Sequence, residues 1–400
     1  MKFAIIKERK SPPDRRVVFS PEKLKQLQAQ FPQAEVVVES SDIRVFPDES
    51  YTAQGLQVSA NILDANVMIG VKEVPISALI PNKSYFFFSH TIKEQPYNRN
   101  LLGAVLEKNI TLYDHETITN ANGARLIGFG RYAGIVGAYN GFRGMGLKSG
   151  DFSLPKAETL PDQKALIDAL NSITLSKQKI VLTGSGKVAY GAKEMLDAMG
   201  LKQVDVEAFL NTEFSESVYC HIDVLDYNKR KDGKVLTNTD FYNNPQDYEN
   251  NFMRFAKVSD VFIAGHFYGQ GSPYIFTKEI AASAESKIKT VADISCDIDG
   301  PVASTIRPST IADPFYGYNP QTGKETAFDD ANSILVMAVD NLPCELPKDA
   351  SEGFGELFLD HVIPAFFDGD ANGILERAKI TENGALTPHF AYLQDYVDGK

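Results

Sequence analysis

Short apolar runs alternate with polar, helix-favouring stretches along roughly the first 115 residues of the chain. The runs are rich in β-branched and aromatic residues, which is typical of buried strands, and they read FAII, EVVV, VMIGV, YFFF and ITLY. Between the first two runs, Ser20 precedes Pro21 and Glu22, and a serine cap before a proline in the first turn predicts the start of a helix. The alternation predicts βαβ units on a mostly parallel sheet.

A second set of such units follows the glycine-rich stretch AGIVGAYNGFRGMG, whose small residues predict a helix packed closely against another backbone, or a hinge. Residues 160–173 predict a short amphipathic helix, and residues 179–200 predict a strand, a glycine turn and a helix. Further strands are predicted at 202–209, 259–265, 289–295 and 334–343. The segment 211–257 is more polar and richer in Asn, Asp and Tyr, which predicts an insertion in this second half.

Length and composition limit the class of protein. A chain of 400 residues exceeds what one core usually organises, so two domains are expected. Hydrophobic residues at 43% are typical of a globular protein, and a net charge of −12 argues against nucleic acid as a partner. The sequence shows neither a signal-peptide core nor an 18-residue uncharged apolar stretch, so no membrane segment is expected. Three separated cysteines indicate a reducing compartment, and we expect a cytoplasmic protein.

A glycine turn between a predicted strand and a predicted helix fits the pattern GxGxx(G/A). Its glycines would let the backbone approach a pyrophosphate, whose charge the amides at the helix start would meet. The alternative is a glycine turn with a purely structural role. The expected cofactor-binding residues of this turn are Gly184, Ser185, Gly186, Lys187 and Val188.

An acid at the end of the following strand is expected to bind the ribose hydroxyls of a dinucleotide. Asp205 and Glu207 both qualify, unless they are solvated residues at a sheet edge. No Arg or Lys follows Glu207 before Lys229, so NAD is favoured over NADP. Asp297 follows another predicted strand and would lie near the nicotinamide if that strand neighbours the glycine turn.

Lys72 and His90 each follow an apolar run of the first half, so both are expected at the carboxyl edge of one sheet, where α/β sites gather. Such a pair can act as acids or bases near neutral pH, although a solvated lysine and a structural histidine are the alternative. Arg16, just before a short strand, could bind a substrate carboxylate. The remaining histidines show no ligand spacing, so no metal is expected.

Several runs resemble lysine-forming saccharopine dehydrogenase, and most closely the lysine:2-oxoglutarate reductase half of the bifunctional enzyme. This branch belongs to the superfamily of alanine dehydrogenase and the nucleotide-binding transhydrogenase subunit. The resemblance extends from Lys7 to about Tyr396. The runs that carry it are GVKEVP, YFFFSHTIKEQPYNRNLL, LYDHE with RLIGFGRYAGIVGA, and DISCDIDG with VDNLPCELPKDASEGFG.

The resemblance implies a role for each matching residue. Lys72 and His90 match the catalytic acid/base pair of the family, and Gly186, Lys187 and Asp297 match positions of its nucleotide site. Positions that contact saccharopine are matched by Arg16, Gln95, Arg125 and Phe129, and acids that tune the catalytic pair are matched by Glu73 and Glu116.

The resemblance also implies the fold and the reaction. We expect an α/β protein of two Rossmann-like, doubly wound parallel-sheet domains flanking a cleft, with residues 1–131 and 326–400 forming the substrate domain and 132–325 the dinucleotide domain. The expected activity is NAD(P)-dependent interconversion of saccharopine with L-lysine and 2-oxoglutarate, with the choice between NAD and NADP left open. The alternatives are reductive amination of a small 2-oxo acid, as in alanine dehydrogenase, and a non-catalytic nucleotide-sensing module.

Overall fold

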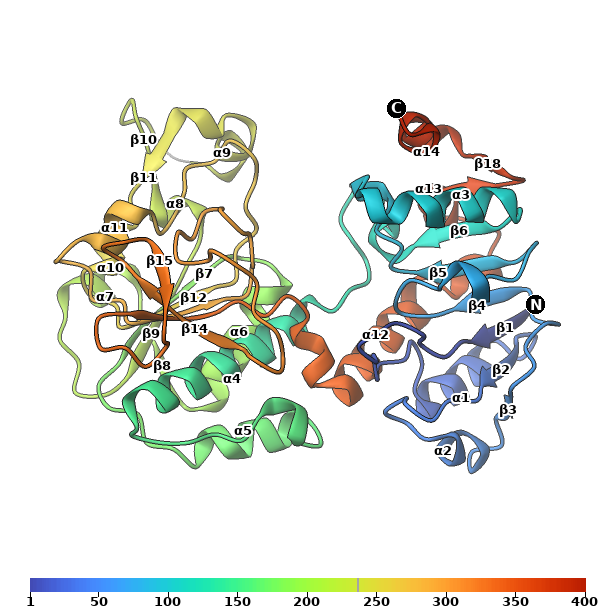
Figure 1. The fold of residues 1–400 in the computed structure, drawn as a ribbon, viewed down its shortest axis with the longest axis horizontal. Coiled ribbons are helices and arrows are strands. Elements are labelled where there is room, and N and C mark those ends of the chain that lie inside the picture. The colour runs from blue at the N-terminus through green and yellow to red at the C-terminus, as the bar shows by residue number, and fades with distance from the viewer. Residues whose placement is uncertain (236) are drawn as a thin grey trace. The chain divides into compact units, whose positions relative to one another are not determined.

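The computed structural model describes residues 1–235 and 237–400, and the chain divides into two compact units (Figure 1). Unit 1 comprises Met1–Phe129 and Pro347–Lys400, and unit 2 comprises Gly130–Leu346. The chain therefore returns to unit 1 at Pro347, later than the expected residue 326. The intervening segment stays in unit 2 because Ile334–Met337 forms strand β16 of that unit's sheet.

Unit 1 is built on six parallel strands in the order β3-β2-β1-β4-β5-β6. This is the strand order of a doubly wound fold, in which the winding reverses between β1 and β4. All five predicted runs are confirmed as strands, whereas the short, partly exposed β3 was not predicted. The strands are β1 (Lys2–Ile5), β2 (Glu35–Glu39), β3 (Gln57–Ser59), β4 (Val67–Ile69), β5 (Ser84–Phe87) and β6 (Thr111–Asp114).

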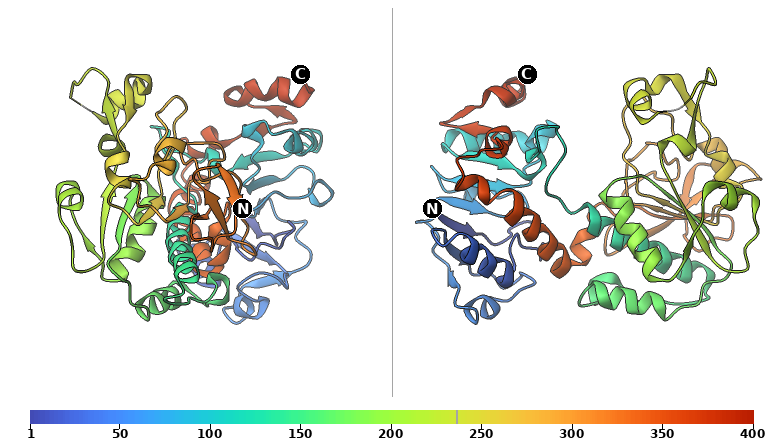
Figure 2. Two further views of the ribbon diagram at one scale, coloured as in Figure 1. Left: turned by 60° about the vertical axis from the view of Figure 1, so that its left-hand side comes forward. Right: turned by 180° about the vertical axis from the view of Figure 1, so that it is seen from behind.

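Helices cover both faces of this sheet. Helices α1 (Pro21–Gln30) and α12 (Pro347–His361) lie side by side on one face (Figure 2), where Leu24 and Phe358 share a core with β1 and β2. The predicted start of α1 is confirmed, because Ser20 Oγ accepts a hydrogen bond from Lys23 N at 3.2 Å. The other face packs against α3 (Arg99–Glu107) and α14 (Gln394–Asp398). The remaining α-helices and strands of unit 1 are α2 (Asp48–Thr52), α13 (Ile374–Ala378), β17 (Thr381–Glu382) and β18 (Ala385–Leu386).

Unit 2 is built on eight strands in the order β15-β14-β16-β13-β12-β7-β9-β8. Six of them are parallel, and β14 and β15 form an antiparallel hairpin at one edge that the sequence pattern did not predict. The strands are β7 (Lys179–Thr183), β8 (Lys202–Gln203), β9 (Val218–Ile222), β12 (Val261–Ala264), β13 (Thr290–Asp293), β14 (Phe315–Asn319), β15 (Lys324–Thr326) and β16 (Ile334–Met337).

The glycine-rich stretch forms the long helix α4 (Gly130–Ser149), which packs backbone to backbone against α6 (Lys187–Ala198). A Cβ atom on Gly134 would lie 2.0 Å from Val188 O, and one on Gly191 would lie 2.0 Å from Arg131 O. The predicted close helix packing is therefore confirmed. A shorter helix, α5 (Gln163–Asn171), also lies where it was predicted.

Two predictions for unit 2 are wrong. The strand predicted at 202–209 contains only the two residues of β8, and helix α7 (Val206–Asn211) follows, because Asp205 Oδ1 caps it by accepting from Ala208 N at 2.8 Å. The predicted insertion at 211–257 contains β9, which is an inner strand of the sheet. The additional elements come after β9: α8 (Val224–Tyr227), β10 (Asn228–Arg230), α9 (Asn238–Asn243), β11 (Tyr248–Asn250) and α10 (Met253–Ala256).

Helix α11 (Lys278–Ala282) completes the set of α-helices in the described ranges. Within residues 1–235 and 237–400, every helix is too short or too polar to traverse a lipid bilayer.

Candidate functional site

Three neighbouring strands of unit 1 end at one edge of the sheet, and each is followed by predicted site residues. Lys72 and Glu73 follow β4, His90 follows β5, and Glu116 follows β6 in the short helix η4 (His115–Thr117). Since β4 pairs with β5 and β5 with β6, both in parallel, their carboxyl ends lie side by side. The structure therefore places these four residues at one edge.

His90 is the centre of a charged cluster at this edge. Its Nδ1 lies 3.1 Å from Glu116 Oε2, and its Nε2 lies 3.9 Å from Glu73 Oε1. Lys93 Nζ lies 3.2 Å from the same oxygen of Glu116. The His90 side chain is 21% exposed, so its ring is held by neighbours and still reaches solvent or a ligand.

Glu116 is kept ionised by the cations around it. Arg125 Nη2 donates to its Oε1 at 3.2 Å. Burial would raise the pKa of Glu116, but the hydrogen bond with His90 and the charges of Lys93 and Arg125 outweigh burial and lower that pKa to about 2. Lys93 Nζ also lies 3.4 Å from Nδ1 of His90, but the contact with Glu116 is the shorter one, and because an ionised carboxylate only accepts hydrogen bonds, it favours a proton on Nδ1. The other nitrogen, Nε2, is then the one that gains or loses a proton.

Glu73 lies on the Nε2 side of His90. Lys10 Nζ pairs with its Oε2 at 2.9 Å. Its Oε1, the oxygen nearer His90, is buried and has no hydrogen-bond partner among the described residues. A buried acceptor without a partner is costly, and an N–H group of a bound amine or a protonated Nε2 would satisfy it.

Arg16 and Phe129 lie in contact, but Arg16 is buried rather than exposed to a substrate carboxylate. Arg16 is only 3% exposed, and its guanidinium stands 4.3 Å from the centre of the Phe129 ring. Its Nε and Nη2 donate to the two carboxylate oxygens of Asp14 at 3.0 and 2.6 Å. Burial would raise the pKa of Asp14, yet the charge of Arg16 lowers it to about 2. Gln95 is exposed, and its backbone carbonyl oxygen accepts a hydrogen bond from Tyr396 Oη at 2.5 Å.

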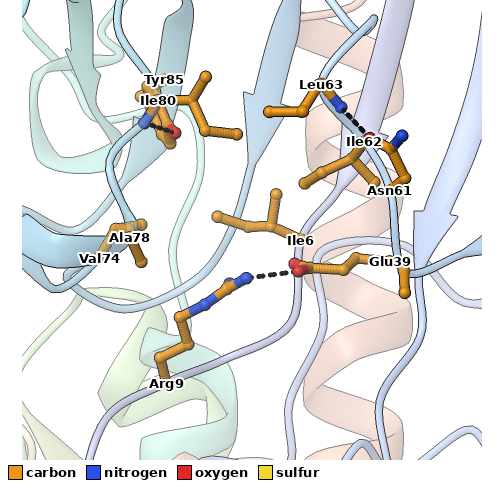
Figure 3. A pocket seen from close by; sticks show the side chains of 11 residues that line it. Ile6, Arg9, Glu39, Asn61, Ile62, Leu63, Val74, Ala78, Ile80 and Tyr85 are labelled. Atoms are coloured by element: carbon orange, nitrogen blue, oxygen red, sulfur yellow. Dashed lines mark hydrogen bonds and ion pairs between the residues drawn. The ribbon is translucent and has the colours of Figure 1, made fainter.

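A separate pocket of about 350 Å³ lies elsewhere in unit 1 (Figure 3). Apolar side chains such as Ile6, Ile62 and Ile80 form most of its wall, and Arg9 and Glu39 form an ion pair in it. None of the predicted site residues lines this pocket within the described ranges. It is therefore distinct from the edge that carries His90.

In unit 2 the glycine turn has the geometry that a dinucleotide needs. Gly184 has φ of +107°, and a Cβ on it would lie 2.5 Å from Gly265 O, so only glycine fits there. Gly186 is the N-cap of α6, and a Cβ on it would meet nothing within 4 Å, which leaves room above the helix start. Ser185, Gly186 and Lys187 are exposed at this end. The amides of the first turn of α6 fit a pyrophosphate.

The structure overturns the reasoning that selected Asp205 and Glu207 as ribose acids. They cap and begin α7, after a strand that is separated from β7 by β9. The acid that directly follows β9, one of the two strands paired with β7, is Asp223, which the sequence pattern did not identify. The signal that could have found it is the apolar run VYCHI followed by an aspartate. His221 of the same strand lies with Nε2 2.5 Å from Gly184 O.

Asp297 follows β13, but β12 lies between β13 and β7. The condition that placed it beside the nicotinamide, direct adjacency to the strand of the glycine turn, is therefore not met. Burial raises the pKa of Asp297. The strand itself ends in Asp293, which is fully buried and accepts from Ser295 Oγ at 2.6 Å and Thr305 Oγ1 at 2.5 Å.

The chain has the fold of the two-domain Rossmann-type dehydrogenases. The predicted fold class is confirmed for both units. Residues 4–136 match the family described as alanine dehydrogenase/PNT, N-terminal domain. Among solved structures, an L-alanine dehydrogenase superposes with a TM-score of 0.66 at 19% identity, over 100% of this chain and 99% of the other. A transhydrogenase from Sinorhizobium meliloti superposes with a TM-score of 0.57 at 16% identity, over 97% and 99%.

The curated relatives confirm the predicted resemblance to the saccharopine branch. The chain is 27% identical to an alpha-aminoadipic semialdehyde synthase of Arabidopsis thaliana, over 90% of this chain and 38% of the relative. The mitochondrial enzyme of that name from Mus musculus is 28% identical over 90% and 44%. This chain thus spans less than half the length of these two relatives. A saccharopine dehydrogenase [NAD(+), L-lysine-forming] from Candida albicans is 24% identical over 92% and 93%.

Proposed function

We propose that this protein is an oxidoreductase that interconverts saccharopine with L-lysine and 2-oxoglutarate. The observation that carries the proposal is the edge of unit 1, where adjacent strands place Lys72 and His90 with Glu73 and Glu116 on either side of the imidazole. The Candida albicans relative supports the substrate, because it matches this chain along nearly its whole length. The expected partners are small molecules, and the net charge of −12 disfavours nucleic acid.

NAD is the proposed cofactor, with NADP the alternative. When bound, a nicotinamide dinucleotide would exchange a hydride with the glutarate carbon that is bonded to the secondary amine nitrogen of saccharopine. The turn Gly184–Val188 and the first amides of α6 would hold its pyrophosphate. Asp223 would bind the ribose hydroxyls and repel a 2′-phosphate.

His90 and Lys72 would move the protons of imine formation and hydrolysis. Because Glu116 holds the proton on Nδ1 of His90, Nε2 can accept a proton from the adding water or return one to the departing amine. The buried Oε1 of Glu73, 3.9 Å from Nε2, stabilises the protonated ring at that moment. Lys72, just after the adjacent strand β4, would exchange a proton with the carbinolamine oxygen.

The basic residues of this edge suit an anionic substrate. The Arg125 side chain is 49% exposed, so its guanidinium can turn from Glu116 to a substrate carboxylate. Arg16 and Phe129 would form a fixed wall of the site, and the exposed Gln95 would donate to a second carboxylate. Within the described residues no disulfide joins Cys220, Cys296 and Cys344, which fits the proposed cytoplasmic location.

The test is oxidation of NADH, followed at its absorbance, with L-lysine plus 2-oxoglutarate in one arm and pyruvate plus ammonia in the other. Turnover in the first arm alone supports the proposal. Turnover in the second arm alone would make the protein an alanine dehydrogenase. Binding of NADH with no turnover in either arm would indicate a nucleotide-sensing module.

A further inference from the structure

A buried carboxylate that belongs to none of the predicted site residues holds the backbone of Lys72. Glu8 follows β1 and is 9% exposed. Its Oε1 accepts from Val71 N at 2.7 Å and its Oε2 accepts from Lys72 N at 2.8 Å. Both carboxylate oxygens are therefore used to fix the two peptide groups that lead to Lys72.

A second buried carboxylate, Asp114 at the end of β6, holds the backbone of His90. Its Oδ2 accepts from Ser89 N and from His90 N, both at 2.9 Å, and from Ser89 Oγ at 2.6 Å. Its Oδ1 accepts from Glu116 N at 2.7 Å. His90 has φ of +55°, a left-handed conformation that is unfavourable for a residue other than glycine. The hydrogen bonds to Asp114 stabilise that conformation.

His115, between Asp114 and Glu116, contacts the backbone just after β4. His115 is fully buried, and its Nε2 donates to Gly70 O, 2.7 Å away, in the peptide segment that leads from β4 to Lys72. Three consecutive residues thus contact the backbone at His90, the backbone before Lys72, and the ring of His90. This segment and Glu8 therefore bond to the backbone at or just before both proposed proton-transfer residues.

We infer that Glu8 and Asp114 are positioning residues, whose carboxylates fix the backbones of Lys72 and His90 in the geometry that proton transfer requires. The inference rests on the proposed function for its kinetic consequence, but not for its geometric one. Loss of such support displaces a reacting group, and a displacement of about 1 Å can cost about a hundredfold in rate. Both carboxylates belong to unit 1, whereas the glycine turn belongs to unit 2, so nucleotide binding should not change.

Glu39 provides a matched control. It is 5% exposed, ends the neighbouring strand β2, and accepts a backbone hydrogen bond from Lys7 N at 2.9 Å. It also forms the ion pair with Arg9 in the pocket of Figure 3. Glu39→Gln therefore removes a buried carboxylate of the same sheet without touching residue 72 or 90. Because Lys7 and Arg9 flank Glu8, this variant is the control for Asp114→Asn.

The kinetic experiment compares Glu8→Gln, Asp114→Asn and Glu39→Gln with the wild type in the lysine and 2-oxoglutarate assay. Glu8→Gln and Asp114→Asn should each lower kcat about tenfold to a hundredfold while the KM for NADH stays within twofold. Glu39→Gln should also lower Tm, but it should lower kcat much less than Asp114→Asn does. If Asp114→Asn does not fold, Ser89→Ala replaces it, because this variant keeps the carboxylate and removes its bond from Ser89 Oγ, together with the contacts of that hydroxyl to Thr91.

Crystal structures of the same variants provide a readout that does not depend on the reaction. The Lys72 backbone should move by about 0.5 Å or more in Glu8→Gln, and the His90 backbone by as much in Asp114→Asn. Folded variants with unmoved backbones and full kcat would overturn the inference. A wild type without turnover in the lysine assay would refute the proposed function instead, and the displacements would still decide the positioning role.

Discussion

Replacing Asp223 should weaken the preference for NADH, because Asp223 is the acid beside the glycine turn. It directly follows β9, whose last residue, Ile222, accepts a hydrogen bond from Gly184 N at 3.0 Å. Glu207 lies in the first turn of α7, on the far side of β9 from the turn. The perturbation is therefore Asp223→Asn, with Glu207→Gln as the control that removes one exposed charge of the same sign.

The magnitude follows from what asparagine keeps and what it loses. Asp223 Oδ1 accepts from Leu225 N at 2.9 Å as the N-cap of α8, and asparagine caps a helix as well as aspartate does. The fold should therefore be unchanged. A hydrogen bond from a ribose hydroxyl to a charged acceptor contributes about 1.5 to 3 kcal/mol, and a neutral amide oxygen retains part of that. We expect the Kd of NADH to rise about tenfold, while that of NADPH falls or stays equal because the charge repelling the 2′-phosphate is gone.

The assay is fluorescence titration of NADH and NADPH, supported by KM values from the lysine and 2-oxoglutarate reaction. Glu207→Gln should change both dissociation constants less than twofold. An unchanged ratio of NADH to NADPH affinity in Asp223→Asn would refute the assignment. A changed ratio in Glu207→Gln, or a wild type that prefers NADPH, would refute it as well.

Three further predictions concern chemistry, packing and pH. Lys72→Met and His90→Gln should each lower kcat about a hundredfold or more with an unchanged KM for NADH, and full kcat in either would remove that residue from the mechanism. Gly191→Ala should lower Tm, since its Cβ would lie 2.0 Å from a backbone oxygen, whereas Gly103→Ala, with nothing within 4 Å, should raise Tm through a helix preference of up to about 1 kcal/mol. Burial raises the pKa of Glu345 from 4.5 to about 7, so the folded state retains a proton that the unfolded chain releases. This group should lower the free energy of unfolding by about 3 kcal/mol as pH rises from 4.5 to 7, and urea titrations of Glu345→Gln should lack that contribution.

The strands that were predicted correctly are those buried on both faces. Runs such as VFIA and ILVM are continuous and apolar because helices cover both sides of a parallel sheet, so the pattern alone identifies them. The hairpin β14–β15 lacks this signal, since β15 is a partly exposed edge strand. The segment VDVEAF alternates apolar and polar residues as a strand does, yet it forms α7 because Asp205 caps a helix and Phe209 is buried by it. Local pattern could not decide between these two outcomes.

The site residues also differ in whether the strand pattern could locate them. Lys72 and His90 could be placed because each follows an apolar run, and parallel strands bring such residues to one edge. Glu8 and Asp114 could not, because their function lies in hydrogen bonds to backbone groups far along the chain, and no residue pattern encodes which backbone a buried carboxylate will meet. The prediction of the ribose acid failed for a different reason. The pattern predicts that the segment 202–209 is the strand next to β7, whereas β9 occupies that position.

The charge around His90 is opposite to the charge of the chain as a whole. The protein carries a net charge of −12, and an unselective surface of that sign would repel a dicarboxylate such as 2-oxoglutarate. At the edge of unit 1, however, the two carboxylates Glu73 and Glu116 pair with three cations, which are Lys10, Lys93 and Arg125. The local excess of positive charge grows by one more when His90 is protonated. The same cations that hold Glu116 ionised, and so assign the proton of His90, therefore also provide the attraction that an anionic substrate needs at this edge.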